Sequence, residues 1–463
     1  MPNPETDPVH RPRLRTLVAM PADTWSEVFT PAARNRLAAV THLLGLQPDG
    51  AQSGGAQLDG AEVSGAQSGG AQSGGARLGG AAGGVQPGRA WTGSLRADDV
   101  RADGVGTDGL RADGVRADGV GTDGLRAHGV GADGLRTGGV RTDGLLVGGA
   151  GASGLWAGGA AVLGCVPRLR GSFASVADEL ADADVLLTGW GCPRITAEVL
   201  DAAPKLRAIV HAAGTIKTFV DPVVFERGIE VSSAAAANAI PVAEFTLAAI
   251  VLAAKRAFRL RDWFRTSGTK RPLPGAPILG TLGTTVGVLG ASRIGRQVIE
   301  RLRHLDVDVL VSDPYLTRTE AAALGARWCE LPELFAASEI VTVHAPLLPE
   351  TRGLVTAELL AAMPDGAVLI NTARGPVVDH AALERECVAG RLDAILDVTD
   401  PEPLPPDSPM LRLPNVFITP HLAGAMGNES TRLGAAAATE LERLATGQPL
   451  AHPITHADLS RIA

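Results

Sequence analysis

Three residues of different chemical type follow apolar runs in the second half of this 463-residue sequence. Arg374 lies in NTARGP after GAVLI, Glu402 in DVTDPEPL after LDAIL, and His421 in ITPHLAG after NVF. A guanidinium grips a carboxylate and a carbonyl oxygen through paired hydrogen bonds in a way that lysine cannot. Imidazole exchanges a proton near neutral pH, and a neighbouring carboxylate favours its charged form. The three residues together predict carboxylate binding combined with proton transfer.

Each of these residues also has an ordinary explanation when it is taken alone. Arg374 would serve as a surface ion-pair partner, Glu402 as a solvated side chain between two prolines, and His421 as a capping or core histidine. The joint interpretation is favoured because all three follow predicted strands. Ligands of open α/β folds bind beyond the carboxyl ends of the strands, where such residues meet.

A nucleotide-binding turn is predicted in VGVLGASRIGR, residues 286–296. Gly290 and Gly295 match the first and third glycines of G-x-G-x-x-G, and Ser292 replaces the second. Serine is compact, its hydroxyl can donate to a phosphate, and the helix N-terminus behind it favours an anion. Asp313 follows 23 residues after Gly290, where a carboxylate accepts both ribose hydroxyls. The negative charge of Asp313 favours NAD over NADP, although the positive charge of Arg318 can moderate this preference. The alternative interpretation of residues 286–296 is a structural turn that binds no ligand.

The elements that position these residues alternate between strand and helix. From residue 286 the apolar runs VGVLG, VDVLVSD, EIVTVHAP, GAVLINTA, LDAILDVT and VFITPH predict a parallel sheet with helices on both faces. Earlier, RLRTLVAM predicts a strand and PAARNRLAAVTHLL a helix. The apolar helix VAEFTLAAIVLAAKRAF is expected in the interior or at a subunit interface. Asn238, Pro241 and Glu244 near its start argue against a membrane span.

A repetitive stretch interrupts the first α/β region between residues 47 and 160. It runs in five-residue units such as GAQSG, RADGV and GTDGL. A pentapeptide solenoid needs a bulky apolar residue at the centre of each unit, where this repeat has Asp or Gly. Segments rich in Gly and poor in aromatics bury too little surface to offset chain entropy. The stretch is therefore predicted to be a disordered insertion rather than an ordered solenoid.

Composition excludes several other classes of function. A net charge of -8 gives no footprint for nucleic acid. The N-terminal residues lack the apolar run of a secretion signal. The four cysteines, Cys165, Cys192, Cys329 and Cys387, are widely spaced, which is typical of reduced thiols in a cytoplasmic protein. No His, Cys and carboxylate cluster has metal-ligand spacing, so no metal site is predicted.

The motifs N-x-A-R-G, D-V-x-x-x-E-P and T-P-H-x-A, in this order after the nucleotide-binding turn, resemble those of the D-isomer-specific 2-hydroxyacid dehydrogenases. The resemblance covers the chain apart from the insertion. It implies a Rossmann dinucleotide-binding domain inserted in a discontinuous flavodoxin-like substrate domain. The implied boundaries are 13–46 and 161–237 for the substrate domain, 47–160 for the insertion, 238–422 for the NAD-binding domain and 423–463 for a return to the substrate domain.

The resemblance also implies residue roles. The family's catalytic Arg, Glu and His correspond to Arg374, Glu402 and His421, and its substrate-carboxylate turn to HAAGTIK, where Ala213 and Gly214 offer backbone N–H groups. Asp397 is expected beside the nicotinamide amide and Asn238 near the hinge between domains. The cofactor contacts implied are Gly290, Ser292, Arg293, Ile294, Gly295, Asp313, His344, Pro346, Thr351, Thr372, Ala373, Asp397, His421 and Gly424.

The leading hypothesis from the sequence is an NAD-dependent oxidoreductase for a 2-hydroxy or 2-oxo acid, assembled as a homodimer through its NAD-binding domains. The alternative is an NAD(H)-gated binding protein, like the dehydrogenase-like corepressors, which share the fold. Formate oxidation is a third option that no feature favours. Lys217 departs from the family, where many members carry an acid or amide after the glycine of the substrate turn. It can attract a second anionic group, although most such lysines are simply solvated.

Overall fold

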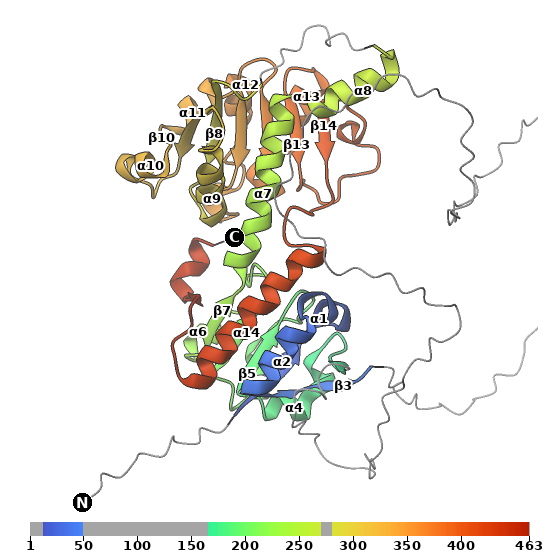
Figure 1. Cartoon of the computed structure of the whole chain (residues 1–463), viewed down its shortest axis with the longest axis vertical. Helices are drawn as coiled ribbons and strands as arrows, with labels where there is room; N and C mark the ends of the chain where they lie inside the picture. The colour runs from blue at the N-terminus through green and yellow to red at the C-terminus, as the bar shows by residue number, and fades with distance from the viewer. Residues whose placement is uncertain (1–12, 50–164, 270–279, 463) are drawn as a thin grey trace, which may run out of the picture. The chain divides into compact units, whose positions relative to one another are not determined.

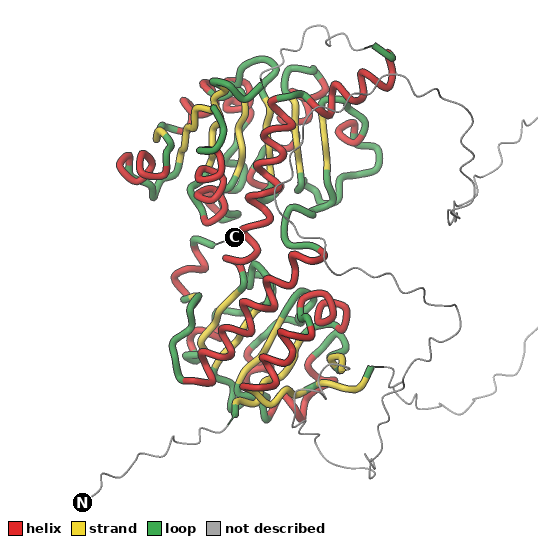
Figure 2. The backbone as a smooth tube through the Cα atoms, viewed as in Figure 1, coloured by secondary structure: helices red, strands yellow, loops and turns green. Residues whose placement is uncertain are grey.

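The computed structural model describes residues 13–49, 165–269 and 280–462 (Figures 1 and 2). The repetitive stretch predicted over 47–160 lies outside these residues except for 47–49. Gln47 and Pro48 form the end of strand β3 (Leu46–Pro48), which pairs antiparallel with β4 (Cys165–Pro167). Pro48 lies opposite Cys165 in this ribbon. The described chain therefore leaves and re-enters the fold at one two-stranded ribbon.

The first sheet has six strands in the order β15-β7-β6-β5-β1-β2. Five are parallel, and only the short edge strand β15 runs antiparallel, against β7. The parallel order 2-1-5-6-7 follows the flavodoxin-like pattern. The strands are β1 (Leu14–Ala19), β2 (Thr41–Leu44), β5 (Val185–Thr188), β6 (Ala208–His211), β7 (Glu230–Ser233) and β15 (Pro453–Ile454).

Apolar side chains alternate between the two faces of this sheet. Val185 and Leu187 enter one core and Leu186 the opposite one, as the two-residue period of a strand requires. One core is closed by α1 (Ala22–Val28), α2 (Pro31–Val40) and α14 (Thr431–Thr446). The other is closed by η1 (Phe173–Val176), α4 (Ala177–Ala181), α5 (Ala197–Asp201) and α6 (Val223–Glu226).

The helix predicted over PAARNRLAAVTHLL is wrong in its last turn. Helix α2 ends at Val40, and THLL forms β2 instead. Thr41 pairs in parallel register with Leu14 of β1, and the side chains of Leu43 and Leu44 enter opposite cores. Burial on both faces of a sheet therefore decided the conformation of a segment whose local pattern continues the helix.

The second sheet has seven strands, all parallel, in the order β10-β9-β8-β11-β12-β13-β14. This is the 3-2-1-4-5-6 order of a Rossmann fold with one further strand. The strands are β8 (Thr284–Leu289), β9 (Val307–Ser312), β10 (Arg327–Trp328), β11 (Ile340–Val343), β12 (Val368–Asn371), β13 (Asp393–Leu396) and β14 (Val416–Ile418).

Helices cover both faces of the second sheet, as predicted. One face packs against α7 (Ala235–Ala254), α9 (Arg293–Leu302) and α10 (Arg318–Leu324). The other packs against α11 (Leu331–Ala337), α12 (Ala357–Ala362) and α13 (His380–Val388). The predicted fold class, a Rossmann domain combined with a flavodoxin-like domain, is confirmed. The strand order changes direction between β8 and β11, and a crevice opens at such a point beyond the carboxyl ends of the strands.

Helix α7 is the one helix among the described residues that is long and apolar enough to cross a membrane. Five of its side chains nevertheless belong to the core under the second sheet: Ala243, Ala249, Ile250, Ala253 and Ala254. Ala237, in its first turn, packs against the core of the first sheet instead. The helix therefore contacts both cores, while Leu252 on it is 39% exposed.

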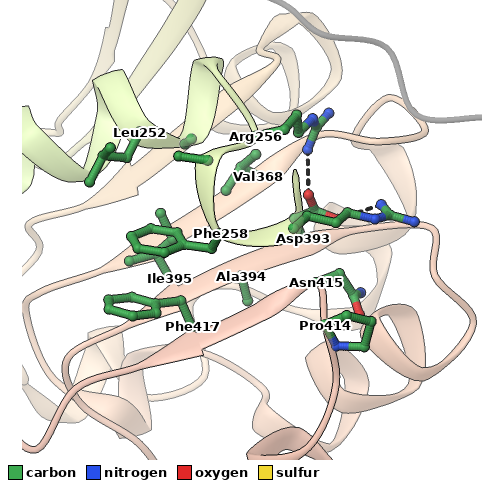
Figure 3. A pocket seen from close by; sticks show the side chains of 13 residues that line it. Leu252, Arg256, Phe258, Val368, Asp393, Ala394, Ile395, Pro414, Asn415 and Phe417 are labelled. Atoms are coloured by element: carbon green, nitrogen blue, oxygen red, sulfur yellow. Dashed lines mark hydrogen bonds and ion pairs between the residues drawn. The ribbon is translucent and has the colours of Figure 1, made fainter. Parts of the chain in front are cut away.

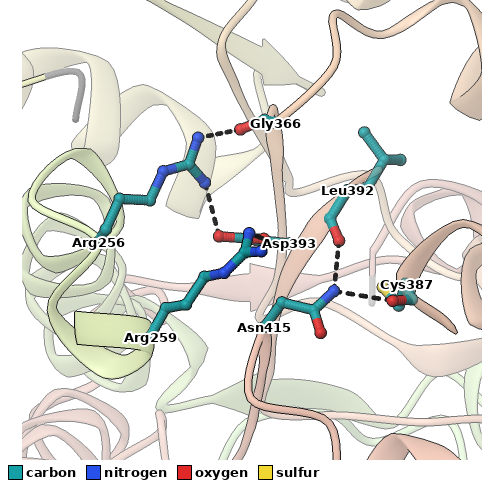
Figure 4. Close-up of polar contacts among 7 residues, drawn as sticks. All are labelled: Arg256, Arg259, Gly366, Cys387, Leu392, Asp393 and Asn415. Atoms are coloured by element: carbon teal, nitrogen blue, oxygen red, sulfur yellow. Dashed lines mark hydrogen bonds and ion pairs between the residues drawn. The ribbon is translucent and has the colours of Figure 1, made fainter. Parts of the chain in front are cut away.

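Helix α8 (Ala257–Ser267) is fixed against the β14 edge of the second sheet. It begins after Arg256, whose backbone is left-handed at φ 52°. Arg256 donates a hydrogen bond to Asp393 at 2.6 Å and another to the carbonyl of Gly366, and Arg259 donates to the same carboxylate at 3.0 Å (Figure 4). Phe258 stacks on Phe417 of β14 with ring centroids 3.8 Å apart (Figure 3).

Candidate active site

The predicted histidine and glutamate are in direct contact. His421 Nδ1 and Glu402 Oε1 are 2.7 Å apart, although the two residues lie on loops that follow different strands. The side chains are 49% and 42% exposed, so this pair can exchange protons with solvent. Because Nδ1 is engaged by the carboxylate, Nε2 is the ring nitrogen left to meet a ligand. This arrangement orients a histidine for general acid–base work.

Asp397 builds the turn that presents His421. Its carboxylate is buried and accepts hydrogen bonds from Thr419 Oγ1 at 2.6 Å, Leu422 N at 2.8 Å and Ala423 N at 2.9 Å. The backbone of His421 is left-handed at φ 55°, a conformation that non-glycine residues adopt at some cost in free energy. The Asp397 contacts hold this turn in place.

Arg374 is presented by a loop that Asn371 folds. The Asn371 side chain accepts from Ala373 N at 2.9 Å and donates to the Arg374 carbonyl at 3.0 Å. A Cβ on the next residue, Gly375, would lie 1.8 Å from the Thr399 carbonyl oxygen, so glycine lets this loop approach the loop that carries Glu402. Burial lowers the pKa of the Arg374 guanidinium, and the Glu402 charge opposes that shift. Arginine stays charged at any physiological pH, so Arg374 is a permanent cation in the cavity.

The nucleotide-binding turn explains why serine is tolerated at its middle position. Gly290 has φ +95°, and a Cβ there would lie 2.8 Å from Ala345 N. A Cβ on Gly295 would lie 2.0 Å from the Gly290 carbonyl oxygen. Ser292 instead has φ -60° and ψ 178°, which any residue adopts, and its Oγ caps α9 by accepting from Gly295 N at 3.3 Å. Two positions of the turn require glycine, and the third does not.

Asp313 lies at the end of β9, beside this turn. One carboxylate oxygen accepts from Ala291 N at 2.7 Å and the other from Tyr315 N at 2.8 Å. Each oxygen keeps further acceptor capacity for a ribose hydroxyl. The close-approach glycines, the first turn of α9 and this carboxylate together fit the diphosphate and ribose of a dinucleotide.

One large cavity, with a volume of about 790 Å³, collects most of the predicted site residues. This volume lies within the range of roughly 300–1,000 Å³ that is usual for ligand sites. Both sheets contribute to its lining, the first through Gly214 among others. The other predicted residues that line it are Ser292, Arg293, Ile294, His344, Pro346, Thr372, Ala373, Arg374, Asp397, His421 and Gly424.

The remaining predicted residues, Asp313 among them, do not line the cavity. Glu402 contacts His421, and Gly290 and Gly295 shape the turn. Ala213 is fully buried. The Thr351 hydroxyl bonds to the Pro346 carbonyl at 2.5 Å and accepts from Leu348 N at 2.8 Å, so it folds its own loop.

Asn238 contacts two parts of the site at once. Its Oδ1 accepts a hydrogen bond from Ala425 N at 2.9 Å. A Cβ added at Gly214 or at Gly424 would lie 3.3 Å from the Asn238 amide. The first turn of α7 therefore lies between the predicted substrate turn and the loop that follows His421.

Three further histidines line the cavity, and two of them, His211 and His344, are buried and differ from His421. His211 bonds through Nδ1 to Thr188 Oγ1 at 2.9 Å, and His344 through Nε2 to Thr342 Oγ1 at 2.9 Å. Burial lowers the pKa of each to about 3. Both rings are therefore neutral near pH 7 and cannot serve there as charged proton donors.

Sequence reasoning missed one wall of the cavity. Residues 451–454 together with Arg461 and Ile462 line it, and no motif in that segment indicates a ligand. Trp190 lines the cavity and also packs against the first core. Among the described residues, no group of three or more His, Cys, Asp or Glu side chains is placed to hold a metal ion.

Comparison with known proteins agrees with this geometry. Residues 247–423 match the family model described as D-isomer specific 2-hydroxyacid dehydrogenase, NAD binding domain. A glyoxylate reductase of Korarchaeum cryptofilum is 32% identical over 276 residues, which are 59% of this chain and 83% of that protein. The chain belongs to the D-isomer-specific 2-hydroxyacid dehydrogenase family. The matched residues 247–423 include all three motifs of the predicted resemblance, and NAD is the cofactor of this domain.

Two further similarities set the extent of the match. A D-3-phosphoglycerate dehydrogenase of Archaeoglobus fulgidus is 33% identical over 264 residues, or 56% of this chain and 49% of that protein. The chain thus spans about half the length of that relative. A Thermus thermophilus protein of known structure superposes with a TM-score of 0.52 at 34% identity, covering 61% of this chain and 89% of that one.

Proposed function

We propose that this dehydrogenase-family protein interconverts a 2-oxo acid and the corresponding 2-hydroxy acid with NAD(H). The observation that carries the proposal is the shared cavity. It brings a permanent cation, Arg374, and a carboxylate-paired histidine, His421, to the same space as Ser292 at the first turn of α9. A clamp for a carboxylate, a proton donor and a dinucleotide site are what this reaction needs.

Arg374 is the proposed clamp for the substrate. Its planar guanidinium matches the carboxylate and the C2 oxygen of a 2-oxo acid, and the backbone N–H of Gly214 lies on the same cavity wall. The desolvation free energy of the Arg374 guanidinium is partly offset when the substrate carboxylate replaces the solvent around it. The clamp fixes C2 in one orientation, which supplies much of the rate enhancement in a two-substrate reaction.

His421 is the proposed proton donor and acceptor. In the reducing direction its Nε2 gives a proton to the C2 oxygen, while the Glu402 contact at Nδ1 orients the ring. In the oxidising direction the same nitrogen takes the hydroxyl proton. When bound, the nicotinamide cofactor supplies or accepts the hydride at C2. The partly exposed imidazole then returns to its starting state by proton exchange with solvent.

The substrate class is proposed from the relatives and from Lys217. The similar proteins are named glyoxylate reductase and D-3-phosphoglycerate dehydrogenase, so small 2-oxo acids, with or without a second anionic group, are the first candidates. Burial lowers the pKa of Lys217, the Glu350 charge raises it, and the Arg374 charge lowers it. Lys217 does not itself line the cavity, so we propose only a long-range preference for a substrate with a second negative charge.

The assembly is proposed to be a homodimer through the NAD-binding domains, with α8 in the interface. No residue of α8 is buried, and Phe264 on it is 54% exposed. The helix lies against β14, the edge strand of the second sheet (Figure 3). An apolar helix face beside a sheet edge is the kind of surface that a second copy covers. Light scattering at micromolar concentration should give twice the mass of one chain.

The proposal also includes the domain boundaries and a cytoplasmic location for the protein. We take residues 13–46, 161–237 and 423–463 as the substrate domain, 238–422 as the NAD-binding domain and 47–160 as an insertion. All four cysteines are free thiols, and three of them are buried, which fits a reducing cytoplasmic setting.

The deciding experiment is NADH oxidation with a panel of 2-oxo acids: glyoxylate, hydroxypyruvate, pyruvate, phenylpyruvate and 2-oxoglutarate. We expect turnover with one or two of them and its loss in His421→Ala. NADH binding without turnover on any acid would favour an NAD(H)-gated binding protein. A protein that does not bind NADH would contradict the proposal.

A further inference from the structure

The segment after α14 is held firmly to the first sheet. Glu440 of α14 is buried, and its carboxylate accepts hydrogen bonds from Ala451 N and His452 N, both at 2.8 Å. Strand β15 then pairs with β7. Leu459 and Ile462 pack against the core of the first sheet. The short helix η6 (His456–Ser460) is therefore fixed by the pairing of β15 before it and by the packing of Ile462 after it.

This segment carries Arg461 to the second sheet. The Arg461 guanidinium lies over the Tyr315 ring, 5.5 Å from its centroid. Tyr315 follows β9, its ring is one of the exposed large side chains of the protein, and its N–H bonds to Asp313. A cation over an aromatic ring at an exposed site contributes little to stability by itself. The contact nevertheless places a planar cation over the ring of a residue whose backbone N–H bonds to the carboxylate that is expected to accept the ribose hydroxyls.

Arg461 also faces the site. It lines the same cavity as Ser292 and Arg293 at the first turn of α9, where the diphosphate is expected. The guanidinium is planar, carries several donors and bonds phosphate oxygens in pairs, and it also stacks on flat rings. An ADP-ribose unit between α9 and Asp313 presents both a diphosphate and an adenine ring to such a group.

We propose that Arg461 is a binding residue for the ADP-ribose half of the dinucleotide, and that Arg461 and Tyr315 form the outer wall of that half of the site. This inference rests on the proposed function only in that the cofactor is NAD(H). If Arg461 binds the cofactor, the first sheet contributes to the cofactor site through residues 451–462, a segment without a nucleotide-binding motif. Glu440 acts as a positioning residue because it fixes the start of the segment.

Titration calorimetry on the full chain tests this with three ligands: NADH, ADP-ribose and reduced nicotinamide mononucleotide. For Arg461→Ala we expect the Kd of NADH and of ADP-ribose to rise about tenfold, the usual loss for one charge-assisted contact to phosphate. The Kd of the mononucleotide should stay within about twofold, since it lacks the adenylate half. Arg461→Lys should lose less than Arg461→Ala, because it keeps the charge.

Arg432→Ala is the matched control, because Arg432 is an exposed arginine on α14 that does not line the cavity. It should leave all three Kd values unchanged, and the thermal unfolding midpoints of the variants should match that of the parent. An unchanged ADP-ribose Kd in Arg461→Ala would overturn the inference, as would an equal loss for the mononucleotide. If the parent protein itself binds neither NADH nor ADP-ribose, the proposed function fails instead.

Discussion

The two sheets contribute to the same cavity in different ways. In the second sheet, Ser292, Asp313, Arg374, Asp397 and His421 each come within a few residues of the end of a parallel strand. The first sheet also contributes strand ends, at 189–192 after β5, 211–219 after β6 and 233 at the end of β7, and it adds residues from 451–462, which follow no parallel strand. A parallel sheet gathers strand ends at one edge, so short motifs identify its site residues. Residues 451–462 follow helix α14 and include the antiparallel strand β15, so no strand-end motif marks them.

The largest expected effect tests the catalytic role of the second sheet. His421→Asn should lower kcat by about 10²–10⁴-fold, because it removes the proton donor. NADH affinity should change little, since Nε2 faces the substrate rather than the dinucleotide turn. Steady-state kinetics and NADH titration measure both quantities. The control is His304→Asn, an exposed histidine just after α9. Equal losses in the two variants would remove His421 from the mechanism.

The second prediction contrasts two positions of the nucleotide-binding turn. Gly295→Ala places a Cβ 2.0 Å from the Gly290 carbonyl oxygen, so the turn must open. We expect a loss of about 2 kcal/mol or more in the free energy of unfolding, together with weaker NADH binding. Ser292→Gly should cost only a few tenths of a kcal/mol, because glycine is a tolerable N-cap. Chemical denaturation checks both, and a turn that accepts alanine at Gly295 would contradict the close-approach argument.

The third prediction compares one buried histidine from each sheet. Burial lowers the pKa of His211 and His344 to about 3, whereas an unfolded histidine titrates near 6.5. Between these values the unfolded chain binds more protons, so the free energy of unfolding should fall as pH falls below about 6.5. Each histidine contributes a slope of up to about 1.4 kcal/mol per pH unit. His211→Gln and His344→Gln should each flatten the curve measured by denaturation between pH 6.5 and 5. An unchanged slope in either variant would show that this histidine is charged in the folded state.

The smallest effect sharpens the role of the first sheet. Glu440→Gln replaces a buried carboxylate that accepts two backbone hydrogen bonds, and we expect about 1–2 kcal/mol lower stability. NADH affinity should fall a few-fold, because the segment carrying Arg461 loosens. Glu442→Gln is the matched control, since its surface pair with Arg36 contributes at most about 1 kcal/mol. Unchanged NADH affinity in Glu440→Gln would show that Arg461 is positioned without Glu440.

Much of the second sheet was predictable from local pattern. Apolar runs predicted its strands, and the positions of Gly290, Gly295 and Asp313 predicted a nucleotide-binding turn, because the close approach of backbone to backbone restricts residue type at those points. The sequence analysis could not place the end of α2, since Thr41 to Leu44 become a strand only through pairing with β1. The assignment of Thr351 to the cofactor stays a prediction; in the structure its hydroxyl bonds within its own loop.

The sequence by itself determined the residue types, their order and the sheet that carries them, because strand periodicity and steric limits on a turn act over a few neighbouring residues. The tertiary structure alone decided that Asp397 holds the turn of His421, that Asn238 lies between two loops, and that Arg461 reaches Tyr315. These contacts join residues that lie tens to hundreds of positions apart. They depend on how helices and strands pack, and no local spacing encodes that packing.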